Sequence, residues 1–216
     1  MPVSVSPSPA PAPVGSAALA LYRQRAQHYD AELVAFEPLR RQAIDLLQLR
    51  PGDTVLDLGC GTGLSLPLLA DQVGRRGRVL GVEPCPEMMA RAAERAAGIT
   101  TAPVALQQSP VAQAHWGRPA DAALFHFTHD LLQQPEAIAH VLAGLRPGAR
   151  VVACGLQWAP PWAWASNWWV LSAALYSITT LSNLHRPWAL LAQAMPGLQV
   201  QPCWSGAIYL GHGLRR

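Results

Sequence analysis

The chain has 216 residues, half of them hydrophobic, which is enough for one domain with a substantial core. Its formal net charge of +3 is too small to indicate nucleic-acid binding. All 16 basic residues are arginine, which excludes every reaction scheme that needs a lysine. The four cysteines are scattered and include no CxxC pair, so the sequence predicts no zinc site.

The N-terminal segment differs in composition from the rest of the chain. Residues 1–16 are rich in proline, alanine and serine and carry no charge, which predicts a disordered or polyproline-like tail. They show no basic stretch followed by an apolar core, so we expect no secretory signal and a cytoplasmic protein. Residues 17–216 are expected to form a single domain. It opens with helical periodicity over 17–31 and 38–49.

Residues 54–65 predict a strand, a glycine turn and a helix in immediate succession. Apolar strand residues lead directly into Gly59, Gly61 and Gly63, and a helical apolar pattern follows. This order is typical of the opening of a nucleotide-type binding unit. The dinucleotide-binding fingerprint needs glycine at its first, third and sixth positions. Counted from Gly59 or from Gly61, the sixth position is a leucine, so the segment does not match this fingerprint.

The rest of the chain alternates strands and helices. Six further strands are expected at 79–82, 103–107, 121–127, 150–155, 198–203 and 206–211. Helical patterns lie between and after them, at 86–97, 135–144, 160–180 and 187–194. Alternation that ends in a terminal hairpin favours an α/β fold with a doubly wound, mostly parallel sheet of seven strands.

The glycine turn also carries a family resemblance. Asp57, one spacer and GxGxG resemble the first motif of the class I S-adenosylmethionine-dependent methyltransferases, and Leu145–Val151 is similar to that family's entry into strand five. The resemblance covers roughly residues 20–212. It implies a Rossmann-like methyltransferase fold whose last strand is antiparallel, with S-adenosylmethionine as the cofactor.

Glu83 stands at the end of the second predicted strand, 20 residues after Gly63. A carboxylate at this distance is placed to accept hydrogen bonds from both ribose hydroxyls of an adenosine. The alternative is an ordinary solvated glutamate in a βα loop. Ligands of open α/β sheets sit beyond the carboxyl ends of the strands. Position and resemblance together suggest these cofactor contacts: Tyr22, Tyr29, Asp57, Gly59, Cys60, Gly61, Gly63, Glu83, Pro84, Ser109, Val111 and Phe125.

Residues 125–130 occupy the position of the fourth family motif. They are neither Asn-Pro-Pro-Tyr nor Asp-Pro-Pro-Tyr, which disfavours methylation of exocyclic amines. His126 and His129 are candidates for a general base, because the ordinary histidine pKa near 6.5 suits that role. The alternative is that one of them caps the following helix or shapes the pocket. Methyl transfer from a sulfonium also proceeds without a strong base, since alignment supplies much of the acceleration.

Tyr22, His28 and Tyr29 precede the first strand. A similar Tyr…Tyr-Asp segment is frequent in small-molecule members of the family, including quinone and phospholipid methyltransferases, where it folds over the cofactor. The resemblance therefore implies N-terminal lid helices over 17–49. An amphipathic helix packed on the sheet is the alternative, and the two are compatible.

Five of the eight tryptophans fall between residues 158 and 169. Prolines and polar residues interrupt this stretch, so a membrane span is not expected. Three alternatives remain. In the first, Trp158, Trp162 and Trp164, together with His28, line an apolar acceptor pocket. In the second, the tryptophans form a surface that contacts a membrane peripherally. In the third, they pack in the core and at a homodimer contact.

These observations together predict a bacterial enzyme that methylates a small, lipophilic or aromatic acceptor and does not act on nucleic acid. The absence of lysine and the abundance of alanine and proline are typical of a GC-rich bacterial genome. The alternative is a catalytically silent member that serves as a cofactor-binding scaffold or partner subunit. The acceptor atom, whether oxygen, nitrogen or carbon, stays open.

Overall fold

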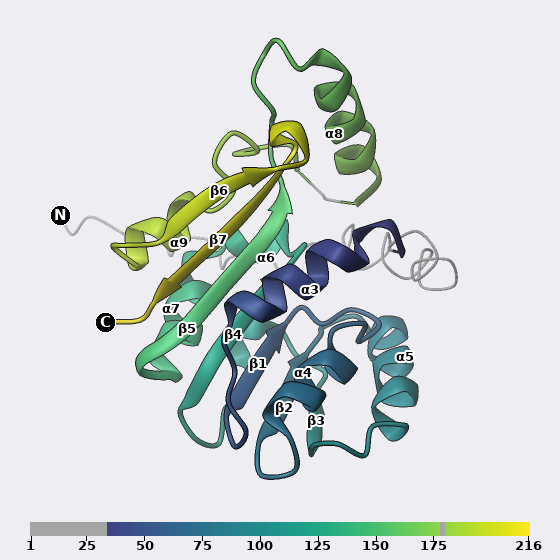
Figure 1. The fold of residues 1–216 in the computed structure, drawn as a ribbon, viewed down its shortest axis with the longest axis vertical. Coiled ribbons are helices and arrows are strands. Elements are labelled where there is room, and N and C mark those ends of the chain that lie inside the picture. The colour runs from purple at the N-terminus through teal and green to yellow at the C-terminus, as the bar shows by residue number, and fades with distance from the viewer. Residues whose placement is uncertain (1–33, 178–179) are drawn as a thin grey trace, which may run out of the picture.

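A seven-stranded sheet forms the centre of the molecule in the computed structural model, which describes residues 34–177 and 180–216 (Figure 1). The strand order is β3-β2-β1-β4-β5-β7-β6. β7 is antiparallel to both neighbours and the other pairs are parallel. This confirms the predicted fold class. The strands are β1 Thr54–Leu58, β2 Arg78–Val82, β3 Val104–Gln107, β4 Ala120–His126, β5 Leu145–Leu156, β6 Gln199–Cys203 and β7 Ile208–Leu214.

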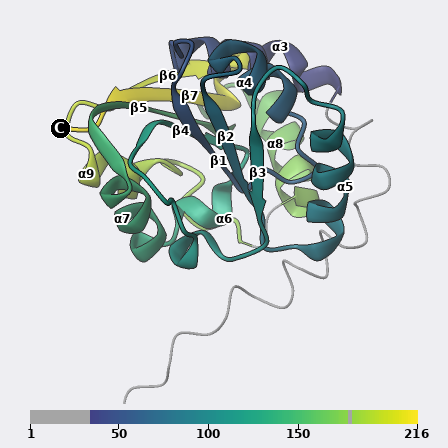
Figure 2. The same cartoon turned by 90° about the horizontal axis from the view of Figure 1, so that it is seen from below.

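Helices cover both faces of the sheet (Figure 2). One face packs against α3 Glu37–Leu46, α4 Leu66–Val73 and α5 Pro86–Ala97. The other packs against α6 His129–Leu132, α7 Pro135–Ala143 and α9 Ala189–Ala194. A further helix, α8 Trp164–Ser177, lies at the top of Figure 1, beyond the carboxyl end of β5. The helix expected over 17–31, with Tyr22, His28 and Tyr29, lies outside the described residues.

The alternation of side chains along β1 decides which residues reach which layer. Every residue of β1 is buried, as expected for a strand with helices on both faces. Leu56 and Leu58 belong to the core under α7, whereas Val55 belongs to the core under α3. Because side chains alternate with a period of two, Asp57 is directed to the α3 side. This register brings the Asp57 carboxylate toward the helix that carries Arg40.

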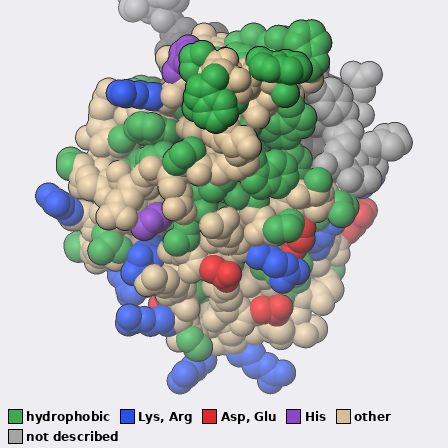
Figure 3. Space-filling view, turned by 45° about the horizontal axis from the view of Figure 1, so that its top comes forward, with side chains coloured by type: hydrophobic (Ala, Val, Ile, Leu, Met, Phe, Trp, Pro, Cys, Tyr) green, Lys and Arg blue, Asp and Glu red, His purple; other side chains and the backbone are tan. Residues whose placement is uncertain are grey.

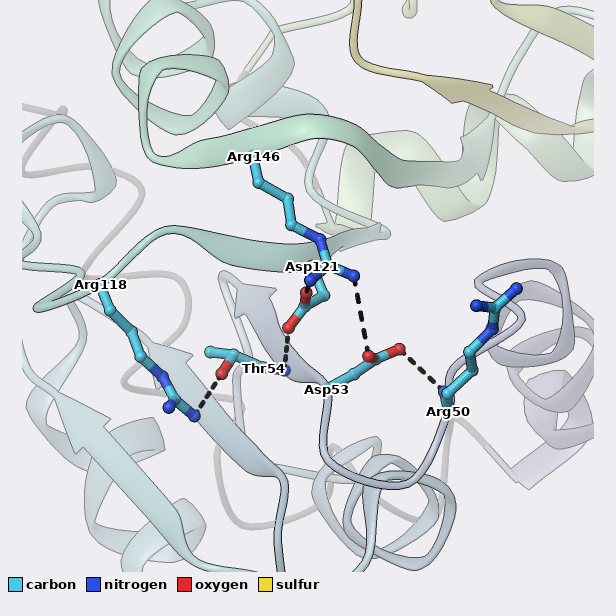
Figure 4. Close-up of polar contacts among 6 residues, drawn as sticks. All are labelled: Arg50, Asp53, Thr54, Arg118, Asp121 and Arg146. Atoms are coloured by element: carbon cyan, nitrogen blue, oxygen red, sulfur yellow. Dashed lines mark hydrogen bonds and ion pairs between the residues drawn. The ribbon is translucent and has the colours of Figure 1, made fainter.

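A polar network fixes the amino ends of the two central strands (Figure 4). The Thr54 N–H donates to Asp121 Oδ2 at 2.6 Å, and Arg118 donates to Thr54 Oγ1 at 2.7 Å. Arg146 pairs with Asp121 and reaches Asp53 Oδ1 at 3.9 Å. Each carboxylate here has a cationic or N–H partner, so the network ties the start of β1 to β4 and β5.

β5 begins earlier than the sequence predicts. The expected turn at 146–148 lies inside the strand, because Leu145 already pairs with Ala120. The register then jumps to Arg150 opposite Ala122, and Gly148 adopts a φ of +80°. A bulge with glycine in the left-handed region accommodates the turn without ending the strand.

α8 is shorter than the apolar stretch 160–180 from which it was predicted. The helix begins after Pro160 and Pro161, which cannot supply backbone N–H groups. The Asn167 side chain accepts from the Ala159 N–H at 2.9 Å and donates to the Ala159 carbonyl at 3.2 Å, fastening the proline turn to the helix. Within the described ranges, every helix lacks the length or the apolar character needed to cross a bilayer.

Candidate functional site

A cavity opens at the carboxyl ends of β1, β2 and β4, with a volume of about 750 Å³ including its open mouth. This is the point where successive connections leave the sheet on opposite faces, and it is the usual ligand position in such folds. The lining residues are Gly59, Gly61, Glu83, Pro84, Met88, Pro110, Val111, His126, Phe127, Thr128, Asp130, Leu131 and Gln134.

The three glycines of the turn serve two purposes. All three have positive φ, from +55° to +80°. Gly59 and Gly61 line the cavity, so they leave the backbone open to a ligand. Gly63 does not line it. A Cβ at Gly63 would lie 2.7 Å from Leu66 Cδ1 and 3.2 Å from Ala92 Cα, so this glycine allows α4 and α5 to pack closely.

Glu83 is held at the cavity wall by two backbone groups. Its Oε2 accepts from the Gly61 N–H at 3.1 Å and its Oε1 accepts from the Cys85 N–H at 2.9 Å. Burial raises the pKa of Glu83, and these two hydrogen bonds oppose the rise. An ionised carboxylate has about four acceptor positions, so capacity remains for a ligand that carries hydroxyl groups.

A smaller hollow adjoins the cavity on its α3 side. The two share His126 and Phe127, and the hollow is also lined by Arg40, Asp57 and Ser65. Arg40 is 3% exposed and donates through Nη1 to Ser65 Oγ at 3.3 Å. Neither Arg40 Nη2 nor Asp57 Oδ2 has a hydrogen-bond partner among residues 34–177 and 180–216.

The charged groups in this hollow indicate a ligand-binding site. Burial raises the pKa of Asp57 to about 7, while Arg40 opposes the rise and Glu83 adds to it. Buried polar atoms without partners are costly, and native proteins retain few of them. A guanidinium donor and a carboxylate acceptor in one hollow complement a ligand with both a carboxylate and an ammonium group. The α-amino-acid group has this chemistry.

The two histidines proposed as bases differ in position. His126 lines both the cavity and the hollow, and its Nε2 is buried with no partner in the described part of the chain. Burial, followed by the charge of Arg40, lowers the pKa of His126 well below 6.5, so its ring is neutral near pH 7. His129 does not line the cavity. Its Nε2 lies 3.1 Å from the Ser182 carbonyl, a contact that connects α6 to the segment after α8.

The segment after β3 supplies the far wall of the cavity. Pro110 and Val111 line it, and the neighbouring Ser109 hydroxyl is buried without a partner in the described ranges. Cys60, another expected contact, lines the hollow rather than the larger cavity. Phe125, also expected to contact the cofactor, is fully buried in the core under α7.

Phe127 is the aromatic residue of this segment that lines the cavity, and the sequence analysis did not single it out. It adopts a φ of +58°, which is uncommon for a bulky side chain. Its ring contacts Phe36 edge-on, with centroids 5.1 Å apart. Phe36 in turn stacks on Trp204 at 5.2 Å and contacts Trp169 at 6.0 Å. We call Phe36, Phe127, Trp169 and Trp204 the aromatic cluster; it runs from the cavity wall to the inner side of α8.

The tryptophans expected in an acceptor pocket lie elsewhere. Trp158 and Trp162 line a separate groove at the ends of β5 and β6, together with Trp204. Trp162 and Trp164 are 78% and 77% exposed. None of the three predicted tryptophans, all of them described residues, lines the cavity at the glycine turn.

Arg40 is the functional candidate that the sequence analysis missed, although the sequence contains its signal. Ala43, Ile44 and Leu47 follow it at the i+3, i+4 and i+7 positions, and all three are buried. An arginine within the apolar stripe of a helix is unusual, because burying a charge is expensive unless it binds a partner.

The fold and the site define a class I methyltransferase architecture. The crystal structure of N-methyltransferase NodS from Bradyrhizobium japonicum WM9 in complex with S-adenosyl-l-homocysteine matches with a TM-score of 0.65 and 15% identity. The match covers 93% of this chain and 99% of that chain. Residues 55–148 match the family described as "Methyltransferase domain". This family match covers fewer than half of the chain's residues and, together with the fold, agrees with the class I methyltransferase prediction from the glycine turn.

Curated relatives match shorter stretches. Nocamycin O-methyltransferase from Saccharothrix syringae is 43% identical over 75 residues, which are 32% of this chain and 27% of that protein. The 23S rRNA (uracil(1939)-C(5))-methyltransferase RlmD from Acinetobacter baylyi is 53% identical over 62 residues, 28% of this chain and 13% of that protein. The matches span less than half the length of these relatives, and their named acceptors differ in chemistry.

Proposed function

We propose that this chain transfers a methyl group from S-adenosylmethionine to a small, lipophilic or aromatic acceptor. The observation that carries the proposal is a pair of polar sites on either side of the glycine turn. Glu83 lies on one side, and the unpartnered atoms of Arg40 and Asp57 lie on the other. S-adenosylmethionine has a ribose diol and an α-amino-acid group, which match these two sites in chemistry. When bound, it supplies a methyl group on a sulfonium with a good leaving group.

The chain's own residues would bind and orient the cofactor. Glu83 accepts hydrogen bonds from the ribose hydroxyls through its remaining lone pairs. Arg40 Nη2 donates to the ligand carboxylate, and Asp57 accepts from its ammonium group. The backbone at Gly59 and Gly61 lies open along the cavity between these ends. Because charge-assisted hydrogen bonds are the strong ones, these contacts supply most of the orientation.

An aromatic acceptor is supported by an aromatic residue of the cavity wall. Phe127 lines the cavity, and its ring packs on Phe36 of the aromatic cluster. Offset and edge-on ring contacts favour a planar aromatic guest. The neutral His126 beside Phe127 is placed to accept a proton from an acceptor hydroxyl or amine. The modest net charge and the lack of lysine support a small molecule over RNA.

Calorimetric titration of the purified protein with S-adenosylmethionine and, separately, with NAD tests the cofactor. We expect micromolar binding of the first, on the order of 8 kcal/mol, and none of the second. Transfer of radiolabelled methyl to phenols, hydroquinones and ribosomal RNA then tests the acceptor. Transfer to RNA alone would overturn the small-molecule assignment. Cofactor binding with no transfer to any acceptor would favour the silent scaffold.

A substitution at His126 tests the base. Loss of a general base typically costs about 100-fold or more in turnover. His126→Gln should therefore lower kcat by that factor and leave cofactor affinity unchanged. His129→Gln is the matched control, because His129 faces Ser182 and not the cavity. Equal kcat values for His126→Gln and the wild type would contradict a general-base role for His126. The acceleration would then come from alignment of the acceptor with the methyl group.

A further inference from the structure

Helix α8 is apolar on its outer side as well as on its inner side. Val170 on the inner side is fully buried. On the outer side Trp164 and Trp168 are 77% and 71% exposed, and Leu175 is 64% exposed. These three residues and Leu171 follow the i, i+4, i+7, i+11 pattern, so they form one stripe along the helix.

The stripe continues onto the proline turn before the helix, where Trp162 is also exposed. We call Trp162, Trp164, Trp168, Leu171 and Leu175 the tryptophan face. Hydrophobic side chains gather over α8 at the top of the surface in Figure 3, and most charged side chains lie below them. Contiguous apolar surface of this kind on a soluble domain usually marks a contact site.

The distribution of charge along the chain indicates what this face contacts. The stretch 151–185 contains no charged residue, and no Asp or Glu occurs after Glu136. Five arginines are the only fully charged side chains in residues 137–216. His185 shares a groove with Trp162, and Arg186 follows it directly. The groove at Trp162 therefore contains a histidine that an arginine follows in sequence, and no residue of 137–216 is acidic.

Glu37, the acidic residue next to Phe36 in the chain, is already paired with two arginines. Glu37 follows the Phe36 that contacts Trp169 on α8. Its Oε2 and Oε1 each lie 3.0 Å from an arginine nitrogen, of Arg40 and Arg41 respectively. Glu37 thus adds little negative charge against an anionic partner.

We infer that the tryptophan face lies in the interface of an anionic phospholipid bilayer. Tryptophan prefers the headgroup boundary, where the ring is apolar and its N–H meets water. α8 has 14 residues and is about 21 Å long, so it lies in the plane of the interface and does not cross it. Arg186 and the lack of acidic residues in 137–216 complement the negative surface. A second copy would bring the same arginine to the contact, with no acidic residue of 137–216 to pair with it.

This surface also has a consequence for the acceptor, a part that rests on the proposed function. α8 packs through Trp169 on Phe36, which packs on the cavity residue Phe127. A lipophilic molecule leaving the bilayer at α8 would meet aromatic rings from the membrane to the cavity. The bilayer contact itself does not depend on methyl transfer.

Sedimentation of the full chain with vesicles tests the inference. The probes are vesicles of phosphatidylcholine alone and of phosphatidylcholine mixed with phosphatidylglycerol, and vesicle-free samples measure aggregation. We expect binding to the mixed vesicles. Trp164→Gln with Trp168→Gln should weaken it at least about tenfold, because two large apolar side chains lose their burial. Arg186→Gln should weaken it about fivefold, on the anionic vesicles only.

Leu214→Gln is the matched control, since Leu214 is 50% exposed at the far end of β7 and should not affect binding. The inference is overturned if the wild type stays in solution, or if the double tryptophan variant sediments as well as the wild type. A wild-type dimer that the double variant dissociates, without lipid binding, would also overturn it. Titration of the same samples with S-adenosylmethionine distinguishes this failure from a failure of the proposed function.

Discussion

The two ends of the central strands treat buried polar groups in opposite ways. At the amino ends, Asp121 and Thr54 form a closed network with Arg118 and Arg146 (Figure 4). At the carboxyl ends, one oxygen of the Asp57 side chain has no partner among residues 34–177 and 180–216, although Thr54 and Asp57 lie on the same strand. Only four residues of β1, from Thr54 to Asp57, thus separate a paired site from an unpaired one.

This contrast shows where stability and function separate. A polar group that is paired within the chain contributes to folding and leaves nothing for a ligand. A buried group without a partner costs folding energy, and it persists where a ligand repays that cost. Substitutions of the first three residues below should affect cofactor affinity at the carboxyl end, and the last should affect stability at the amino end.

Loss of the Glu83 carboxylate should have the largest effect. Hydrogen bonds to a charged group contribute about 1.5–3 kcal/mol each, so losing two of them should weaken S-adenosylmethionine binding about 100-fold or more. Glu83→Ala is measured by calorimetry, with Glu83→Gln as the isosteric control that retains part of the affinity. An unchanged Kd for Glu83→Ala would place the ribose site elsewhere.

Substitution of Arg40 should have the next largest effect. Arg40→Gln removes the donor expected to bind the ligand carboxylate, which should raise the Kd about thirtyfold. Arg41→Gln is a matched control, because Arg41 also pairs with Glu37 but is 61% exposed. Equal losses in the two variants would indicate a general effect of charge, and the Arg40 assignment would then be wrong.

The protonation of Asp57 should make cofactor affinity depend on pH. With the pKa of Asp57 raised to about 7, the ionised form needed to bind an ammonium group is rare at pH 5.5. Affinity should therefore increase about tenfold between pH 5.5 and 7. Asp57→Asn should bind weakly at both values and abolish the slope. A wild-type Kd that is constant across this range would contradict the role of Asp57.

The Asp57 carboxyl group should also make the stability of the ligand-free protein depend on pH. Stability should decrease as the pH rises, whereas cofactor affinity should increase. The pKa of Asp57 is raised from 3.8, so the folded state binds the proton more tightly than the unfolded chain. Its contribution to stability is complete below pH 3.8 and is lost as the pH rises through about 7. Denaturant unfolding of the wild type and Asp57→Asn over this window should show a larger loss in the wild type, because Glu83, whose pKa is also raised, titrates in both.

Substitution at the amino end should have the smallest effect and should spare the ligand. Asp121→Asn weakens the charge-assisted contacts to the Thr54 N–H and to Arg146, at a cost of about 1–2 kcal/mol. This corresponds to a decrease in Tm of about 4 °C for a chain of this size. Calorimetry should give an unchanged Kd for S-adenosylmethionine. A large loss of affinity would mean that the two ends are coupled.

Much of the fold follows from the sequence because its signals are local. Pro86 and Gly98 enclose a helix that the structure has at Pro86–Ala97. The apolar run before Gly59 becomes a fully buried strand, and the hairpin at the C-terminus produces the antiparallel β7. The strand order of the sheet was not predicted, since local patterns do not specify which strands are neighbours.

The site is less predictable because it is assembled from distant segments. Glu83 and the glycine turn are close in sequence, and their spacing alone suggests their roles. Arg40 reaches the site only because α3 packs on β4 and β5, beside β1, and no local sequence pattern predicts this packing. Phe127 replaces Phe125 at the cavity because β4 ends at His126 and the backbone then turns into the left-handed region. The exposure of Trp164 depends on which side of α8 meets the sheet.

The family match ends at residue 148, and the residues around the cavity come from both sides of this position in the chain. Glu83, Asp57 and the glycines come before it, whereas Trp169, Trp204 and α8 come after it. The residues proposed to hold the cofactor thus lie mostly within the stretch that the family model matches, and the aromatic residues proposed for the acceptor side lie mostly outside it.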